Sequence, residues 1–337
     1  MSRVTSVSSR GVGFAVAVLV AVLLAACGAT TASPAASTPS SSFKLQSEYV
    51  KLVQDVGPSV VLIETSVGLG SGIIYDAQGD IVTNNHVVAG SQTFLVVLSN
   101  GKQYPATLVG TYAPDDLAVI RIHATGLHPT TFANSSNLQV GDIVMAIGNP
   151  LGLQSSVSEG IVSALRTAIP EGNGVTLPSA IQTTAAINPG NSGGALVNLN
   201  EQVVGIPTLA ATDPQLGGGA APGIGFAISS NTVTLIANQL IKTGTVANSG
   251  RAALGAQVAN TGGSGAVVTT VKSGGPAALA GIKVGDTITA IGGQSVTGAQ
   301  AVADVLLTLK AGQQVTVNLT HSDGSTGSVS VTLTELQ

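Results

Sequence analysis

Short apolar runs separated by turns dominate the chain from about residue 57 to Ile228. They recur about every 8–12 residues, with Gly, Asn-Gly or Gly-Asp turns such as Asn100-Gly101 between them. This spacing is typical of an all-β sandwich or barrel. A less regular stretch, residues 128–141, divides the region into two halves of similar size. The pattern therefore predicts two successive small barrels, at about residues 50–130 and 138–230.

Two other patterns follow the β-rich region. A Ser-Asn-Thr cap at residues 230–232 precedes apolar residues at helical spacing, and Gly244 ends the run. This combination predicts a closing helix over residues 231–243. Residues 249–337 then alternate short strands with two helical segments, which is the size and pattern of one small α+β domain. The predicted fold class is mainly β.

The N-terminus has the features of a targeting segment. Arg3 and Arg10 flank the start of an apolar run, residues 13–26, which is shorter than a membrane-spanning helix requires. The run ends in Leu-Ala-Ala-Cys, and Cys27 is the only cysteine. This resembles a bacterial lipobox, which implies a signal peptide at residues 1–26 and a lipid on Cys27. The alternatives are a plain signal peptide with an incidental cysteine, or an uncleaved anchor.

Residues 27–45 are rich in Ser, Thr, Ala and Pro after the cysteine. Such a composition predicts a flexible tether. Together with the lipid on Cys27, it predicts a protein of the cell envelope, anchored to a membrane outside the cytoplasm.

Composition and charge exclude several functions. Charged residues make up only 8 % of the chain, its formal net charge is −4, and no cluster of Lys and Arg occurs. These features argue against binding to nucleic acid. The chain lacks the GxxxxGK[ST] pattern of a phosphate-binding loop, so nothing indicates the use of ATP. We predict neither a metal nor another cofactor.

Three segments carry the candidate chemistry. A predicted strand ends at His86, another begins after Asp115-Asp116, and a glycine-rich stretch, NPGNSGG, surrounds Ser192. A serine hydroxyl becomes a good nucleophile only when a base takes its proton, and an acid orients that base. Histidine suits the base because its ordinary pKa lies near neutral pH. The order His, Asp, Ser matches that of chymotrypsin-type serine proteases. Either Asp115 or Asp116 could supply the acid.

The glycines around Ser192 predict an oxyanion-binding site. Without side chains in the way, the N–H groups of Gly190 and Ser192 can converge on the oxyanion of a tetrahedral intermediate. The same Gly-x-Ser-x-Gly pattern also fits the nucleophile elbow of α/β-hydrolases, but that elbow requires a following helix and a later catalytic histidine. Residues 195–204 instead predict a hairpin, and the only later histidine, His321, lies in a polar turn. We interpret His321, like His123 and His128, as solvated.

The chain resembles the HtrA (Deg) family of trypsin-like serine proteases. The matching segments are GSGII (70–74), TNNHVV (83–88), DLAV (116–119), IGNPLG (147–152), GIVSA (160–164), AINPGNSGG (186–194) and GIGFAI (223–228). The resemblance implies His86, Asp116 and Ser192 as the triad, because the family motif places the acid directly before Leu-Ala. It implies two six-stranded chymotrypsin-like β-barrels within residues 46–248. It also implies an ATP-independent endopeptidase that degrades unfolded polypeptides and assembles as a homotrimer.

The C-terminal unit, residues 249–337, resembles the PDZ domain of the same family. GPAALAGI (275–282) and VGD (284–286) match it well. Leu254, Gly255 and Ala256 then correspond to the loop whose N–H groups receive the terminal carboxylate of a peptide. The resemblance implies binding of peptide C-termini, and the alternative is a domain that acts only as a spacer.

By the same resemblance, Ala186 lies at the floor of the specificity pocket. An uncharged floor predicts cleavage after Val, Ala or Leu and not after Lys or Arg. The chain departs from the family pattern at Thr184, Ala195 and Pro207, which puts the register of the substrate in doubt. A different kind of function is also open, a latent holdase that binds peptides mainly through its PDZ domain.

Overall fold

The structure, a computed structural model, describes residues 41–149, 156–172, 175–188, 190–213, 219–261 and 264–336. The predicted signal peptide and Cys27 lie outside these residues. The chain divides into two units between Leu45 and Gln46, and the barrels and the C-terminal domain belong to the second. Helix α1 (Ser41–Val56) begins within the range for which the sequence predicted a tether. No helix of the described residues is long and apolar enough to cross a membrane.

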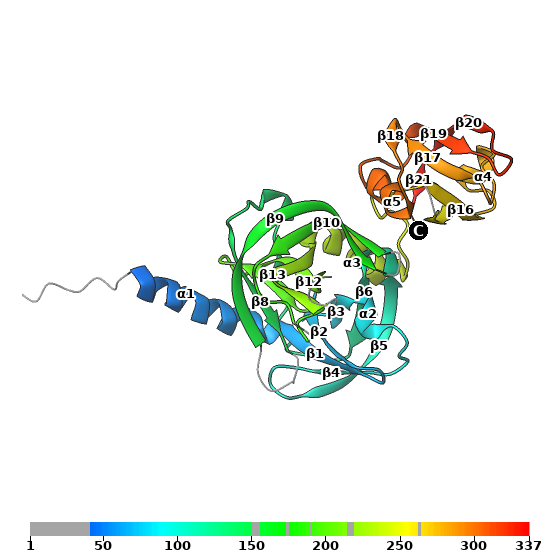
Figure 1. Cartoon of the computed structure of the whole chain (residues 1–337). Helices are drawn as coiled ribbons and strands as arrows, with labels where there is room; N and C mark the ends of the chain where they lie inside the picture. The colour runs from blue at the N-terminus through cyan, green and yellow to red at the C-terminus, as the bar shows by residue number, and fades with distance from the viewer. Residues whose placement is uncertain are drawn as a thin grey trace, which may run out of the picture. The chain divides into compact units, whose positions relative to one another are not determined.

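The first barrel is a closed sheet of six antiparallel strands (Figure 1). Its strands pair in the order β1-β2-β3-β6-β5-β4. They are β1 (Val60–Thr65), β2 (Leu69–Ile74), β3 (Asp80–Asn84), β4 (Phe94–Val97), β5 (Gln103–Tyr112) and β6 (Leu117–Ile122). Short helical turns connect them: η1 (Gly57–Ser59), α2 (Asn85–Val88) and η2 (Ala113–Asp115).

Alternate residues of these strands fill two different cores. Val61, Ile81 and Ile120 face the interior of the first barrel. Their neighbours Val60 and Val82 face a larger cluster shared with the second barrel. Because both of its faces are buried, the first four residues of β1 form a continuous apolar run and do not alternate with polar residues.

The second barrel also closes with six strands. They pair in the order β11-β8-β9-β10-β13-β12, and a β11–β12 pairing closes the ring. The strands are β8 (Ile143–Gly148), β9 (Ser156–Gly172), β10 (Val175–Thr183), β11 (Ala195–Asn198), β12 (Gln202–Asp213) and β13 (Gly219–Ser229). The short β7 (Thr131–Phe132) adds parallel to β12, and η3 (Ser135–Asn137) follows it. The prediction of two six-stranded barrels is confirmed.

Helix α3 (Ser230–Thr243) follows the second barrel. Its buried residues Val233, Ile236 and Leu240 recur at helical spacing and join the cluster shared by the two barrels. The helix ends at Gly244, whose φ of 73° lies in the left-handed region that glycine adopts at little cost. The helix therefore covers the seam between the barrels.

The C-terminal domain has its own core around Ala266, Ile288 and Val317. Its main sheet has the order β15-β16-β17-β19-β20. The elements are β14 (Ala252–Ala253), β15 (Ala256–Asn260), β16 (Ala266–Val271), α4 (Pro276–Leu279), β17 (Thr287–Ile291), β18 (Gln294–Ser295), α5 (Ala299–Leu307), β19 (Gln314–Thr320), β20 (Thr326–Thr332) and β21 (Thr334–Glu335). β14 pairs with β21, so the first and last strands of the domain lie side by side.

The sequence predicted that the histidine in the polar turn of this domain is solvated, but this histidine has a partner in the protein. His321 Nδ1 lies 2.9 Å from Asp286 Oδ1. Asp286 is buried, and the pair joins two segments that are far apart in the sequence. The interpretation of His321 as simply solvated is wrong, because its partner Asp286 lies 35 residues away in the sequence and local patterns do not reveal it.

Candidate active site

The pairing of β3 with β6 brings His86 and Asp116 together. Asn84, the last residue of β3, lies opposite Leu117, the first residue of β6. His86 follows β3 within α2, and Asp116 directly precedes β6. His86 Nδ1 lies 2.7 Å from Asp116 Oδ2, and the backbone N–H of His86 donates to Asp116 Oδ1 at 2.9 Å. One carboxylate therefore fixes both the ring and the backbone of the histidine.

Asp116 is buried and held by further contacts. Its backbone carbonyl accepts from Asn84 Nδ2 and from the N–H of Asn85, both at 3.0 Å. Its φ of 51° and ψ of 43° place it in the left-handed region, which a non-glycine residue adopts at some cost and Asp tolerates better than most. Because an ionised carboxylate can only accept, His86 carries its hydrogen on Nδ1, which leaves Nε2 as the acceptor nitrogen of the ring.

The left-handed turn also separates the two adjacent acids. Asp116 faces His86, whereas Asp115 is fully buried and pairs with Arg251 of the C-terminal domain at 2.5 Å. The residue pattern left either acid possible and the family resemblance implied Asp116, and in the structure the two side chains have different partners.

Ser192 lies between β10 and β11, at the second barrel. Its Oγ donates to the backbone carbonyl of Thr208 at 3.2 Å. Thr208, on β12, donates its own hydroxyl hydrogen to Asp116 Oδ2 at 2.7 Å. A chain of contacts thus links His86, Asp116, Thr208 and Ser192 across the two barrels. The sequence analysis did not single out Thr208, and nothing in its local pattern marks it.

Two glycines beside Ser192 are required by the backbone. Gly190 has a φ of 103° and Gly193 a φ of 80°, both in the left-handed half of conformational space. A Cβ on Gly193 would lie 2.1 Å from the carbonyl oxygen of Ser71, so no other residue fits there without displacing β2. The glycine-rich stretch therefore lets the serine loop lie directly against the first barrel.

Ser71, on β2, holds this loop at two points. Its N–H donates to the carbonyl of Ser192 at 2.9 Å, and its hydroxyl donates to the carbonyl of Gly190 at 2.6 Å. The same hydroxyl accepts from the N–H of Asn149 at 2.8 Å, and Ser71 is fully buried. Ser71 thus positions both residues whose N–H groups were predicted to bind an oxyanion. The sequence analysis quoted it only as part of the Gly-Ser-Gly match.

Ala186 lies on the loop between β10 and Ser192, with its side chain exposed. Its carbonyl accepts from Ser158 Oγ of β9 at 2.8 Å and from Asn191 Nδ2 at 3.2 Å. Thr184, one of the departures from the family pattern, accepts from the N–H of Ile161 through its hydroxyl at 3.0 Å. The loop is therefore attached to β9, and the exposed side chain at residue 186 carries no charge.

In the C-terminal domain, Leu254 and Gly255 connect β14 to β15, and Ala256 is the first residue of β15. The carbonyl of Leu254 accepts from the N–H of Ala277, and that of Gly255 from the N–H of Lys272, both at 2.8 Å. β15 is the edge strand of its sheet. An edge strand can accept an added strand from a peptide.

In the part of the chain that the structure describes, no group of three or more His, Cys, Asp or Glu side chains is arranged to hold a metal ion.

The fold and the site define a serine peptidase of the trypsin-like class joined to a PDZ domain. The trypsin-like peptidase domain family matches residues 70–206, and the PDZ domain family matches residues 252–333. The chain is 40 % identical to serine protease PepD of Mycobacterium tuberculosis, over 98 % of this chain and 75 % of PepD. It is 39 % identical to periplasmic serine endoprotease DegP of Escherichia coli, over 79 % of this chain and 57 % of DegP.

Among solved structures, the HtrA-type protease AlgW with a decapeptide matches with a TM-score of 0.63 and 29 % identity. The match covers 86 % of this chain and 99 % of that one. The chain belongs to the HtrA family, and it is a serine endopeptidase.

Proposed function

We propose that Ser192 is the nucleophile, His86 the general base and Asp116 the acid that orients His86. The observation that carries this assignment is the set of contacts around Thr208, which joins Asp116 to the Ser192 loop. Asp116 holds the His86 ring with its hydrogen on Nδ1, and it stabilises the imidazolium that forms when Nε2 takes the serine proton. The same proton then goes to the leaving amine.

The N–H groups of Gly190 and Ser192 bind the oxyanion of the tetrahedral intermediate. Support comes from Ser71, which bonds the carbonyls of both residues and so limits rotation of the peptide planes in this loop. Donors that are fixed before the reaction stabilise the developing charge without reorganisation during the reaction.

Ala186 forms the floor of the specificity pocket, and cleavage follows small or medium apolar residues such as Val, Ala or Leu. A trypsin-like pocket needs a carboxylate to bind Lys or Arg, and none is present at Ala186.

The PDZ domain binds the C-termini of peptides through Leu254, Gly255 and Ala256. The peptide adds to the free edge of β15, which follows this loop directly. Support also comes from AlgW, which was solved with a decapeptide.

The enzyme works outside the cytoplasm on unfolded polypeptides, as an ATP-independent homotrimer anchored through a lipid on Cys27. The periplasmic location in the name of the related DegP supports the compartment. The sequence Leu-Ala-Ala-Cys supports the anchor.

The test is the digestion of an unfolded protein, casein, by residues 44–337 beside the Ser192→Ala variant, with the cuts mapped by mass spectrometry. Loss of the nucleophile is expected to lower the rate by at least about 10⁴-fold. Cuts after Val, Ala or Leu that are absent in the variant support both the triad and the pocket. Cuts mainly after Lys or Arg contradict the pocket, and no cuts by either protein favour the latent holdase.

A further inference from the structure

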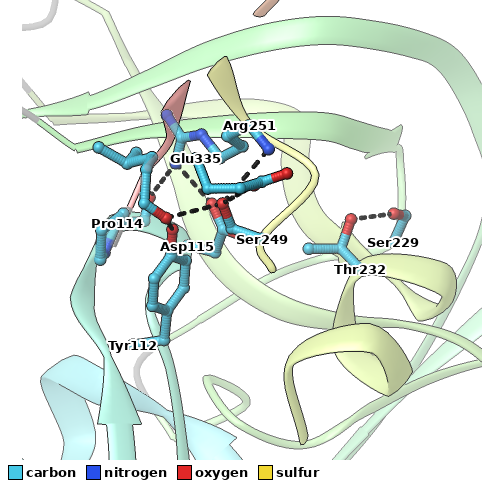
Figure 2. Close-up of polar contacts among 9 residues, drawn as sticks. Tyr112, Pro114, Asp115, Ser229, Thr232, Ser249, Arg251 and Glu335 are labelled. Atoms are coloured by element: carbon cyan, nitrogen blue, oxygen red, sulfur yellow. Dashed lines mark hydrogen bonds and ion pairs between the residues drawn. The ribbon is translucent and has the colours of Figure 1, made fainter. Parts of the chain in front are cut away.

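The segment that carries the proposed catalytic acid is bonded at both of its ends to the base of the PDZ domain. Figure 2 shows these contacts. The hydroxyl of Tyr112, at the end of β5, donates to the carbonyl of Leu336 at 3.0 Å. Three residues further on, Asp115 Oδ1 accepts from Arg251 Nη1 at 2.5 Å, and the same nitrogen donates to the carbonyl of Pro114 at 2.7 Å. Asp116 is the next residue.

Arg251 and Leu336 belong to one small structure at the base of the PDZ domain. Leu336 donates its N–H to the carbonyl of Arg251 at 2.9 Å. The adjacent strands β14 and β21 pair with each other, and Ser249 Oγ lies within bonding distance of both Glu335 Oε2 and the Leu336 carbonyl. A displacement of the domain base therefore moves Arg251 and Leu336 together.

The Asp115 carboxylate depends strongly on Arg251. Asp115 has no exposed surface, and the Arg251 side chain is only 11 % exposed. Asp115 Oδ2 accepts no hydrogen bond from any residue that the structure describes. Arg251 is thus the group that compensates its charge, and a buried carboxylate that loses its partner must take up a proton or move into water.

We propose that Arg251, supplied by the PDZ domain, is a positioning residue for the catalytic acid Asp116. The inference rests on the proposed triad. While Arg251 is bonded to Asp115 and Pro114, the turn that ends in Asp116 stays closed. That turn is strained, since Asp116 has a φ of 51°, and it therefore needs contacts that hold it. When the base of the PDZ domain moves away, Asp115 turns toward water. The Asp116 carboxylate then no longer holds its hydrogen bonds to His86.

The structure gives this coupling a dependence on pH. Burial raises the pKa of Asp115 to about 6, and Arg251 acts in the opposite direction. The other ionisable groups at this joint are the Tyr112 hydroxyl and the Glu335 carboxylate, and the pKa of Tyr112 is raised, mainly by burial. Removing Arg251 raises the pKa of Asp115 further, so the carboxyl stays neutral and buried at low pH and becomes an uncompensated charge at high pH.

The experiment measures kcat/KM for a peptide substrate between pH 6 and 8.5, for the full mature chain and its variants. Arg251→Met is expected to be close to the wild type at pH 6. At pH 8.5 it is expected to be about tenfold or more less active, because an uncompensated ionisation costs up to tenfold per pH unit. Two further variants are expected to show a ratio of variant to wild-type kcat/KM that changes little with pH. They are Arg251→Lys, which keeps the charge, and the double variant Asp115→Asn/Arg251→Met, which removes the carboxylate.

The matched control is Arg121→Met. Arg121 binds the buried Asp80 through two nitrogens at 2.8 Å, also in the first barrel but at the other end of β3 from His86. This variant is expected to have a lower Tm than the wild type. The ratio of its kcat/KM to that of the wild type is expected to stay constant with pH. The proposal is overturned if Arg251→Met has the pH profile of the wild type. It is also overturned if Arg121→Met shows the same slope, or if the double variant does not flatten the ratio. Retained activity in Ser192→Ala would instead contradict the triad itself.

Discussion

Thr208 donates its hydroxyl hydrogen to Asp116 Oδ2 at 2.7 Å, from a strand of the second barrel to an acid of the first. Its backbone carbonyl accepts from the Ser192 hydroxyl at 3.2 Å. Because Thr208 is buried, these bonds do not compete with water. Thr208 therefore holds the Asp116 carboxylate in its orientation and also holds the Ser192 hydroxyl.

We expect Thr208→Val to lower kcat by about 10- to 150-fold, since a hydrogen bond to a charged group contributes about 1.5–3 kcal/mol. Thr208→Ser keeps the hydroxyl and is the control, and its kcat should stay close to that of the wild type. Steady-state kinetics on a peptide substrate measure both. A loss in Thr208→Ser with none in Thr208→Val would show that packing of the methyl group matters and the hydroxyl does not.

Ser71→Ala is expected to lower kcat by about tenfold or more with little change in KM. It removes the donor to Gly190 and the acceptor for Asn149, and each buried group left without a partner costs about 1–3 kcal/mol. The rate of labelling of Ser192 by a fluorophosphonate, measured beside kcat, tests whether the serine loop is affected. Unchanged labelling together with a lower Tm would limit Ser71 to a structural role.

Asp115→Asn is expected to gain stability relative to the wild type as the pH rises. The pKa of Asp115 is raised from 3.8 to about 6, so the folded protein holds this proton more tightly than the unfolded chain. The stability of the wild type therefore falls between about pH 4 and pH 6, and the shift corresponds to about 3 kcal/mol. Asparagine does not titrate, so the difference in unfolding free energy between variant and wild type grows over that range.

Urea unfolding at pH 4 and pH 7.5 measures this difference. Asp304→Asn changes an exposed carboxylate of α5 and serves as the control. A difference for Asp115→Asn that does not change with pH would mean that Asp115 ionises in the folded protein as it does in water.

Ala186→Asp is expected to shift cleavage from sites after Val, Ala or Leu to sites after Lys or Arg. Because the Ala186 side chain is exposed, the new carboxylate can be introduced without burying an unpaired charge. Mass spectrometry of casein digests measures the change, with Ala186→Ser as the uncharged control. If the aspartate leaves the profile unchanged, another residue forms the floor of the pocket.

Peptides with a free C-terminus are expected to bind the PDZ domain about tenfold or more tighter than the same peptides with a C-terminal amide. The reason is that charge-assisted hydrogen bonds from backbone N–H groups contribute about 1.5–3 kcal/mol. Fluorescence polarisation on the full mature chain measures the affinity. Equal binding of the two forms would exclude the loop at Leu254, Gly255 and Ala256 as a carboxylate site.

The sequence by itself determined the mainly β class, the two barrels and helix α3, because these depend on local periodicity and on turn residues. The β-branched apolar run at residues 60–63 favours a strand, and the apolar residues after Ser229 recur at helical spacing. The candidate residues His86 and Ser192 were also visible, since strand ends and glycine-rich loops leave a local signature.

Only the tertiary structure decided what supports the site and how the two adjacent acids reach different partners. Asp115 and Asp116 are neighbours with the same side chain, and the left-handed turn sends them to different partners. The contacts of Thr208, Ser71 and Arg251 join residues 92, 119 and 136 positions apart. No local pattern encodes such pairs, because they form only when closed barrels and a joined domain bring distant strands together.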